Sequence, residues 1–308
     1  MKSKYKYLLT ITVSITIIAL IAVVAINSKS TSGSSNTKIK VVAGENFWGS
    51  LVSQIGGDKV SVLSIVSDPN ADPHEYESNT TDARAVSTAN YVILNGAGYD
   101  SWGDKLLAAS PSSTRVNLNV ANLLGKKDGD NPHFWYSPSY VNIVINKMEE
   151  NLAAIDPRDV GYFQNNLIQL KASLSTYQSR ISDIKDHYGG TKVAATEDIF
   201  AYLAQAAGLD LISPPQFIQA VAEGNDPPAS SVVLFQQQLA SNQVKLMVYN
   251  EQTVTPLTTN MKKLATDNNI PIVGVTETIQ PPNTTFQDWM NSQTIDLLNA
   301  INSQSFGQ

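Results

Sequence analysis

A long helical segment without strand signals divides this chain and most constrains its fold. Between Ser139 and His187, apolar residues recur at helical spacing. Asp156-Pro157 interrupts this pattern with an N-cap residue followed by a proline suited to the first helical turn. The second helix then continues for about 30 residues, which is longer than most helices of globular proteins, and ends at Gly189-Gly190. Such a helix predicts a rigid connector between two lobes.

Short apolar runs of strand type alternate with helical patterns on both sides of this connector. Alternation at this spacing predicts parallel, doubly wound sheets. The expected fold is therefore α/β, with two lobes of parallel sheet joined by one long rigid linking helix, and 308 residues suffice for two cores. The predicted strands are Ile39–Ala43, Val60–Val66, Tyr91–Leu94, Lys192–Ala195, Val244–Tyr249 and Pro271–Val275. The predicted divisions are an N-terminal segment (1–38), a first lobe (39–138), linking helices (139–190) and a second lobe (191–308).

The N-terminal segment has the pattern of a targeting sequence. A cluster of lysines precedes the uncharged apolar stretch Leu8–Ile26, and a Ser-rich tether follows it. This stretch approaches the roughly 20 residues that cross a bilayer, so an uncleaved anchor is favoured over a signal peptide. Val23-Val24-Ala25 leaves cleavage open as the alternative. Because the lysines should stay in the cytoplasm, the bulk of the chain is expected outside the cell, tethered to the membrane or secreted.

Charge and cysteine content exclude several classes of function. A net charge of -6 and the absence of a basic patch interleaved with aromatic residues argue against a nucleic acid partner. The printed sequence contains no cysteine, which rules out disulfides, thiolate metal sites, cysteine nucleophiles and the acylated cysteine of a bacterial lipoprotein. A metal bound by this chain would therefore have histidine nitrogen and carboxylate oxygen as ligands.

Four residues stand where a metal site could form. Ligands of open parallel sheets bind at the carboxyl ends of strands. His74 follows a predicted strand in a rigid Asp-Pro-His setting, His133 stands in a second Pro-His pair before the linking helices, and Glu197 and Glu277 each follow a strand of the second lobe. Two imidazoles and two carboxylates suit Mn²⁺, Fe²⁺ or Zn²⁺.

Other titratable residues compete for these roles. Asp198 stands beside Glu197, and Glu251 and Glu223 are rivals of Glu277. The third histidine, His187, ends the linking helix, where it fits the helix dipole, so no ligand role is expected. The Asn-Gly-Ala-Gly run at 95–98 lacks the third glycine of a dinucleotide fingerprint and predicts a tight turn.

Five segments together resemble the solute-binding proteins of metal-ion ABC transporters, the cluster that includes zinc- and manganese-binding lipoproteins. They are Asp72–Glu77, Ala89–Asp100, Asn131–Trp135, Thr196–Leu203 and Ile270–Thr278. The resemblance covers residues 39–303. It implies a receptor that captures a metal ion as cargo between its lobes and delivers it to a permease driven by an ATPase, and we expect a monomer without enzymatic activity.

The chain departs from that family in three ways. Glu277 replaces the usual aspartate and adds a methylene group, the lipid-anchored cysteine is missing, as fits a membrane anchor, and the segment around residues 126–130 lacks the His/Asp-rich loop of many zinc-binding members. The missing loop, together with Glu197, where zinc-binding members commonly have histidine, favours Mn²⁺ over Zn²⁺ or Fe²⁺. Protonation of the histidines is expected to weaken binding below about pH 6.

Two alternatives remain open at the level of sequence. A metal-dependent hydrolase would need an open ligand position and a general base, for which Glu75 or Asp198 could serve, although no HExxH pair is present. A receptor or adhesin for a non-metal ligand could use the same two lobes.

Overall fold

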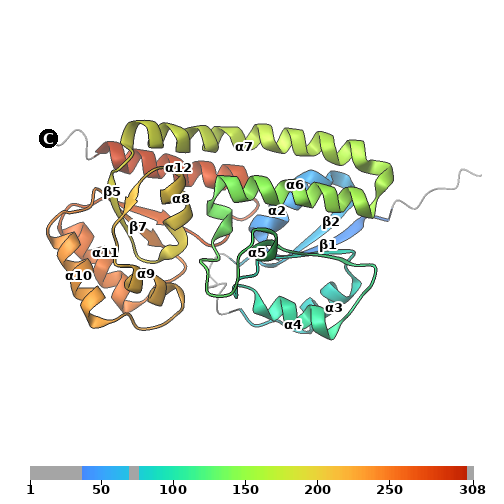
Figure 1. Ribbon diagram of the computed structural model, residues 1–308, viewed down its shortest axis with the longest axis horizontal. Coiled ribbons are helices and arrows are strands. Elements are labelled where there is room, and N and C mark those ends of the chain that lie inside the picture. The colour runs from blue at the N-terminus through green and yellow to red at the C-terminus, as the bar shows by residue number, and fades with distance from the viewer. Residues whose placement is uncertain (1–36, 69–75, 304–308) are drawn as a thin grey trace, which may run out of the picture. The chain divides into compact units, whose positions relative to one another are not determined.

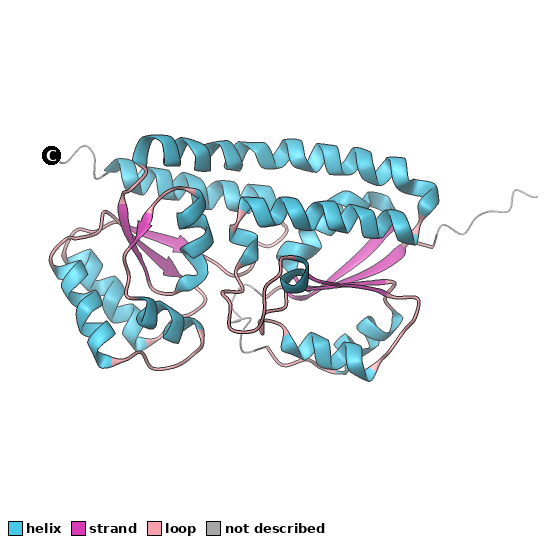
Figure 2. Cartoon of the chain, in the orientation of Figure 1, coloured by secondary structure: helices cyan, strands magenta, loops and turns pink. Residues whose placement is uncertain are grey.

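Two parallel four-stranded sheets, one in each lobe, carry the fold (Figure 1, Figure 2). The computed structural model describes residues 37–68 and 76–303. The predicted membrane segment Leu8–Ile26 and the candidate ligand His74 lie outside the described residues. In the part that is described, no helix combines the length and hydrophobicity required of a membrane span.

The first lobe has the strand order β2-β1-β3-β4. Alternating side chains of β1 point to opposite faces. Val41 and Ala43 join the core under α2 (Asn46–Gly56), α6 (Pro138–Ile155) and α7 (Val160–Tyr188), whereas Val42 packs with residues of α3 (Thr80–Thr88). The elements of this lobe are β1 (Ile39–Glu45), α2 (Asn46–Gly56), β2 (Val60–Val66), α3 (Thr80–Thr88), β3 (Tyr91–Leu94), α4 (Ser101–Ala109), β4 (Val116–Asn119) and α5 (Val120–Leu123).

The second lobe repeats this plan with the order β6-β5-β7-β8. One face of its sheet packs on α9, α10 and α11, and the other face joins the core shared with the linking helices. Its elements are β5 (Lys192–Ala195), α8 (Ala201–Ala206), β6 (Asp210–Leu211), α9 (Pro215–Ala222), α10 (Ala229–Ala240), β7 (Met247–Asn250), α11 (Pro256–Asp267) and β8 (Ile272–Val275).

The linking helices are α6 (Pro138–Ile155) and α7 (Val160–Tyr188), and α7 has 29 residues. The prediction of one long connector is confirmed. The sequence did not reveal that the last helix, α12 (Phe286–Ser303), returns to lie along α7 (Figure 1). Hydrogen bonds from Arg180 Nη1 to Thr294 Oγ1 (3.2 Å) and from Tyr188 Oη to Asn302 Oδ1 (2.5 Å) join the two helices.

One hydrophobic core runs from the first sheet through the linking helices into the second sheet. The lobes are therefore joined by continuous apolar packing, which limits how far they can separate without exposing it.

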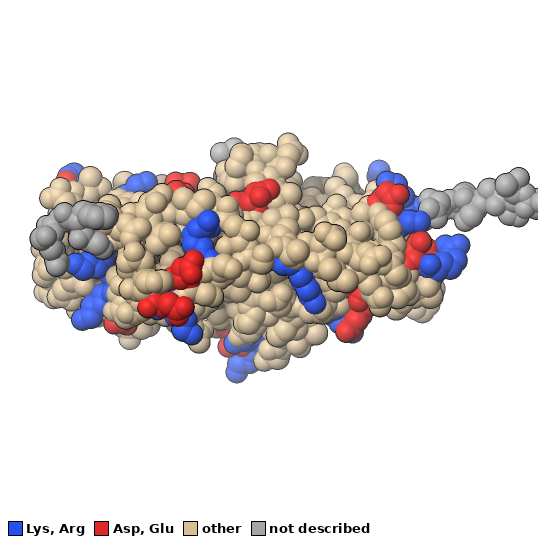
Figure 3. All heavy atoms as spheres, turned by 90° about the horizontal axis from the view of Figure 1, so that it is seen from above, with Lys and Arg blue, Asp and Glu red and all other residues tan. Residues whose placement is uncertain are grey.

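On the face of the molecule seen in Figure 3, basic and acidic side chains are interspersed rather than gathered by sign.

The buried stripe of α7 predicts a stability effect. Leu174 is fully buried in the shared core, whereas Ile168 on the same helix is 61% exposed. Replacing Leu174 by alanine should lower the free energy of unfolding by about 2–5 kcal/mol, because it leaves a cavity. Ile168→Ala should change it by less than about 0.5 kcal/mol. Urea unfolding of both variants tests this, and equal effects would contradict the packing of α7.

Candidate metal site

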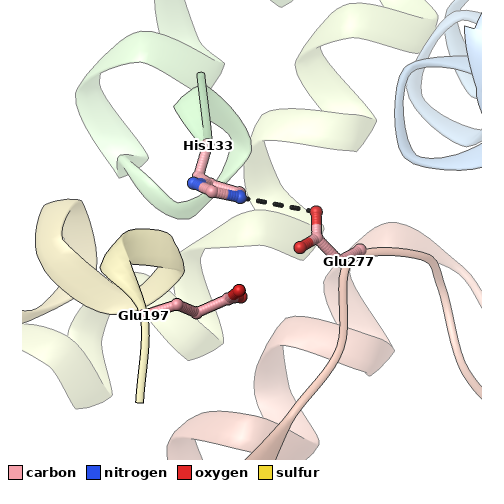
Figure 4. Close-up of side chains that lie close together, drawn as sticks. All are labelled: His133, Glu197 and Glu277. Atoms are coloured by element: carbon pink, nitrogen blue, oxygen red, sulfur yellow. Dashed lines mark ion pairs between the residues drawn. The ribbon is translucent and has the colours of Figure 1, made fainter. Parts of the chain in front are cut away.

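Three of the four candidate ligands meet in a buried cluster. His133, Glu197 and Glu277 each offer an atom within 4.8 Å of the others (Figure 4). All three side chains have no solvent exposure. His133 immediately precedes a short 3₁₀ turn, Phe134–Tyr136, while Glu197 and Glu277 lie just beyond the ends of β5 and β8. The fourth candidate, His74, lies outside the described residues.

Asn250, at the end of β7, lies between the two glutamates and was missed by the sequence analysis. Strand β7 is the neighbour of both β5 and β8, so the three carboxyl ends are adjacent. The Asn250 amide donates hydrogen bonds to Glu197 Oε1 and, over 2.9 Å, to Glu277 Oε1. It therefore holds the two carboxyl groups side by side. The sequence signal for Asn250 was its position at the end of the strand that lies between the two strands bearing the glutamates.

The imidazole of His133 is oriented from both of its nitrogens. Nε2 lies 3.4 Å from Glu277 Oε2. Nδ1 lies 2.9 Å from Asn131 Oδ1 and 3.1 Å from Asp198 Oδ1. Because both partners of Nδ1 are acceptors, Nδ1 carries a proton and Nε2 faces the carboxylate cluster.

The turn at residues 95–98 supports the segment that carries His133. Asn95 Nδ2 donates to the Pro132 carbonyl (2.9 Å), and Asn95 Oδ1 accepts from Trp48 Nε1 (3.1 Å). Positive φ angles of 77° at Gly96 and 85° at Gly98 suit glycine and make this turn tight, as predicted. The turn thus positions a metal-site segment rather than serving only as a connection.

Glu277 is held by both lobes. Its Oε2 accepts a hydrogen bond of 2.7 Å from Tyr99 Oη in the first lobe. Its backbone N–H donates to Gln252 Oε1 (2.7 Å), and the neighbouring Thr276 carbonyl accepts from Tyr136 Oη (2.9 Å). The orientation of this carboxylate is therefore set before any ion arrives.

Burial and neighbouring charges shift the ionisation of the cluster. Burial raises the pKa of Glu197 well above its usual value, and the charge of Glu277 raises it further. Burial alone would lower the pKa of His133, but Glu277 and Asp198 outweigh it and raise the pKa to about 10. In the metal-free site the His133 ring therefore holds a second proton, at Nε2, in addition to the one at Nδ1. A bound dication would replace the proton at Nε2.

A second pair of buried carboxyls, Glu45 and Asp100, lies in the first lobe, close enough to the cluster for the charge of Glu277 to affect Glu45. Burial, followed by the charge of Asp100, raises the pKa of Glu45 well above its usual value. Burial also raises the pKa of Asp100 to about 6, although backbone N–H groups of Gly96 and Asn95 oppose the shift. Glu45 is the last residue of β1 and immediately precedes α2. The raised pKa values favour the neutral, protonated forms of these carboxyls, most strongly for Glu45.

The rivals named from the sequence lie elsewhere. Glu223 and Glu251 are exposed to solvent. Asp198 is 17% exposed and contacts Nδ1 of His133, on the other edge of the ring from the cluster. His187 is exposed at the end of α7, where its Nδ1 lies 2.9 Å from the Asp183 carbonyl.

The chain matches the protein family described as "Zinc-uptake complex component A periplasmic" (ZnuA) over residues 41–300. Since this match spans most of the chain, the protein belongs to that family of metal-binding, substrate-binding proteins of ABC transporters. The family predicted from the five segments is confirmed. Its members serve transport rather than catalysis.

Individual relatives carry different metals in their names. The chain is 26% identical over 254 residues to the manganese ABC transporter substrate-binding lipoprotein PsaA of Streptococcus pneumoniae, covering 76% of this chain and 78% of that protein. It is 28% identical over 190 residues to the iron ABC transporter substrate-binding lipoprotein MtsA of Streptococcus pyogenes serotype M1. That match covers 56% of this chain and 60% of MtsA. The structure of FpvC from Pseudomonas aeruginosa with Mn²⁺ superposes on this chain with a TM-score of 0.70 at 18% identity. The superposition covers 87% of this chain and 99% of FpvC. The two-lobed α/β fold is thereby confirmed.

Proposed function

We propose that this protein captures a divalent transition metal between its lobes, with His74, His133, Glu197 and Glu277 as ligands, and delivers it to an ABC permease. The observation that carries this proposal is the fully buried cluster of one imidazole and two carboxylates whose ligand atoms lie within 4.8 Å of one another. Four protein ligands would leave no open position, which suits binding rather than catalysis.

Mn²⁺ is the cargo that we propose, with Fe²⁺ and Zn²⁺ as competitors. Two carboxylates favour a harder ion than a histidine-rich site does, and relatives are named for manganese and for iron. Zn²⁺ binds more tightly than Mn²⁺ at most such sites. Selectivity in the cell would therefore depend on geometry and supply as well as on the ligand set.

The cellular setting follows from the relatives and from the N-terminal sequence. Relatives are named as lipoproteins, and we propose that this chain, which has no cysteine, is instead tethered outside the cell by residues 1–38. We further propose that the chain acts as a monomer, with lobes at 39–138 and 191–308 joined by linking helices at 139–190. Its partner would be a permease with a cytoplasmic ATPase.

Metal content and metal-dependent stability test the proposed function. The purified protein is analysed for bound elements, stripped with a chelator and heated with Mn²⁺, Zn²⁺ or Fe²⁺. At a metal concentration about a hundredfold above Kd, binding should stabilise the fold by about 2.7 kcal/mol. A melting temperature that ignores all three metals would overturn the proposal.

Metal uptake should also release protons. The pKa of His133 is about 10 in the folded protein, above the value near 6.5 expected in the unfolded chain. Its proton therefore stabilises the metal-free fold. This stabilisation is fully present below about pH 6.5 and is lost as pH rises through about 10. At about pH 8 the metal must displace that proton, so metal affinity should keep rising with pH well above pH 6. A histidine with an unshifted pKa would instead give little further rise in affinity above about pH 6. Calorimetry in buffers of different ionisation enthalpy should give at least one proton released per ion, from His133, and the raised pKa of Glu197 favours additional release. No buffer dependence would contradict a protonated His133.

A further inference from the structure

The second nitrogen of the His133 ring links the two lobes. Asn131, which belongs to the same segment as His133, accepts a hydrogen bond from Nδ1 over 2.9 Å. Oδ1 of Asp198, which follows β5 in the second lobe, lies 3.1 Å from the same nitrogen. Asn131 Nδ2 donates to the Asp198 carbonyl over 2.7 Å, which assigns Oδ1 of Asn131 as the acceptor facing His133. The ring is thus held by one acceptor from each lobe.

Further contacts hold the Asp198 segment in place. Tyr202 Oη donates to the Asn131 carbonyl over 2.9 Å, and the backbone N–H of His133 donates to Asn131 Oδ1 over 2.9 Å. The stretch from Asp198 to Tyr202 therefore meets the His133 segment at three contacts. They are Asp198 Oδ1 with His133 Nδ1, the Asp198 carbonyl with Asn131 Nδ2, and Tyr202 Oη with the Asn131 carbonyl. Withdrawal of this stretch would remove the Asp198 carboxylate from the ring.

We propose that Asp198 is a positioning residue for the metal ligand His133, acting from the opposite lobe, so that the ion is held tightly only while residues 198–202 lie against Asn131. The inference rests on the proposed function. A carboxylate on the second ring nitrogen fixes the orientation of a metal-binding histidine and strengthens its donation to the ion, and loss of such a partner typically costs about 10- to 100-fold in affinity.

The place of Asp198 in the structure supports positioning rather than direct ligation. Its carboxylate lies at the Nδ1 edge of the imidazole, whereas Glu277 lies at the Nε2 edge. Asp198 is 17% exposed and lines a cavity of about 490 Å³ with Asp130, Asn131 and residues of α9. The Asp198 side chain is therefore partly exposed, unlike the ligand cluster, although its Oδ1 atom beside His133 is buried.

Asp198→Asn is the direct test, with Asp130→Asn as the control that alters the same cavity without touching His133. Affinity and dissociation rate for Mn²⁺ are measured by chelator competition on the intact chain. Asp198→Asn should weaken binding about 10- to 100-fold, mainly through faster dissociation, while Asp130→Asn should stay within about twofold. Tyr202→Phe keeps the carboxylate but removes one link, and should speed dissociation to a smaller extent.

A spectroscopic readout separates positioning from a general loss of structure. The chain has three histidines, so ¹⁵N-histidine labelling of the Zn²⁺-loaded protein resolves each ring. The Nδ1 proton of His133 should move upfield in Asp198→Asn and stay unchanged in Asp130→Asn, because only the former weakens the acceptor. Unchanged affinity and an unchanged Nδ1 proton in Asp198→Asn would overturn the inference alone. Absence of metal binding in the wild type would overturn the proposed function as well.

Discussion

His133→Ala should abolish tight metal binding and destabilise the metal-free protein. The imidazole is fully buried beside Glu277 and is the only described histidine in the cluster. Its loss removes a ligand and the positive charge beside Glu277. Affinity should therefore fall by more than the roughly 10- to 100-fold that loss of a supporting residue costs. Removing one partner of a buried ion pair costs about 3–5 kcal/mol, and the metal-free fold should lose a similar amount at neutral pH.

His187→Ala is the matched control, because that ring is exposed at the end of α7. Metal competition assays and urea unfolding in a chelator measure both effects for the two variants. We expect His187→Ala to retain wild-type affinity and to change stability by less than about 0.5 kcal/mol. If His133→Ala kept undiminished affinity, the ion would have to bind elsewhere.

Asn250→Asp should make folding strongly dependent on metal. The amide of Asn250 is fully buried and donates to both Glu197 and Glu277. An aspartate at this position would replace the shared donor with a third carboxylate between two others. The metal-free fold should lose about 3 kcal/mol or more, because a buried charge is left uncompensated. A bound dication should recover much of this loss, so the rise in melting temperature with Mn²⁺ should exceed that of the wild type.

Two further variants separate the causes. Asn250→Ala removes the donor without adding charge and should cost less than Asn250→Asp in the absence of metal. Asn122→Asp, on an exposed residue of α5, reports the cost of the same chemical change at the surface. Thermal unfolding of the three variants with and without Mn²⁺ gives the comparison. Equal losses for Asn250→Ala and Asn250→Asp would show that the glutamates do not share a low-dielectric site with residue 250.

The ligand-bearing positions were predictable because strand ends are encoded locally. Glu197 and Glu277 each follow an apolar run by two residues, and parallel strands bring such positions to one edge of a sheet. His133 was predictable from its Pro-His setting before the linking helices. For His74 the prediction stays untested, since it lies outside the described residues.

Asn250 stands at a strand end, but the contacts that support the ligands could not be predicted, because they join distant parts of the chain. Tyr99 donates to a carboxylate 178 residues away, and Asn250 reaches across 53 residues to Glu197. Neither residue belongs to a pattern of hydrophobic period or turn chemistry. The return of α12 onto α7 is likewise a matter of which apolar faces remain uncovered once both sheets have formed.

The sequence alone determined two α/β lobes, a long helical connector and strand ends bearing acid groups, since hydrophobic periodicity and strand-end position are local properties. Only the tertiary structure decided how the buried site is held: Asn250 between two glutamates, Asp198 across the lobes from His133, and Tyr99 on Glu277. Hydrogen bonds form between groups that packing brings within about 3 Å, and no spacing along the chain reports that distance.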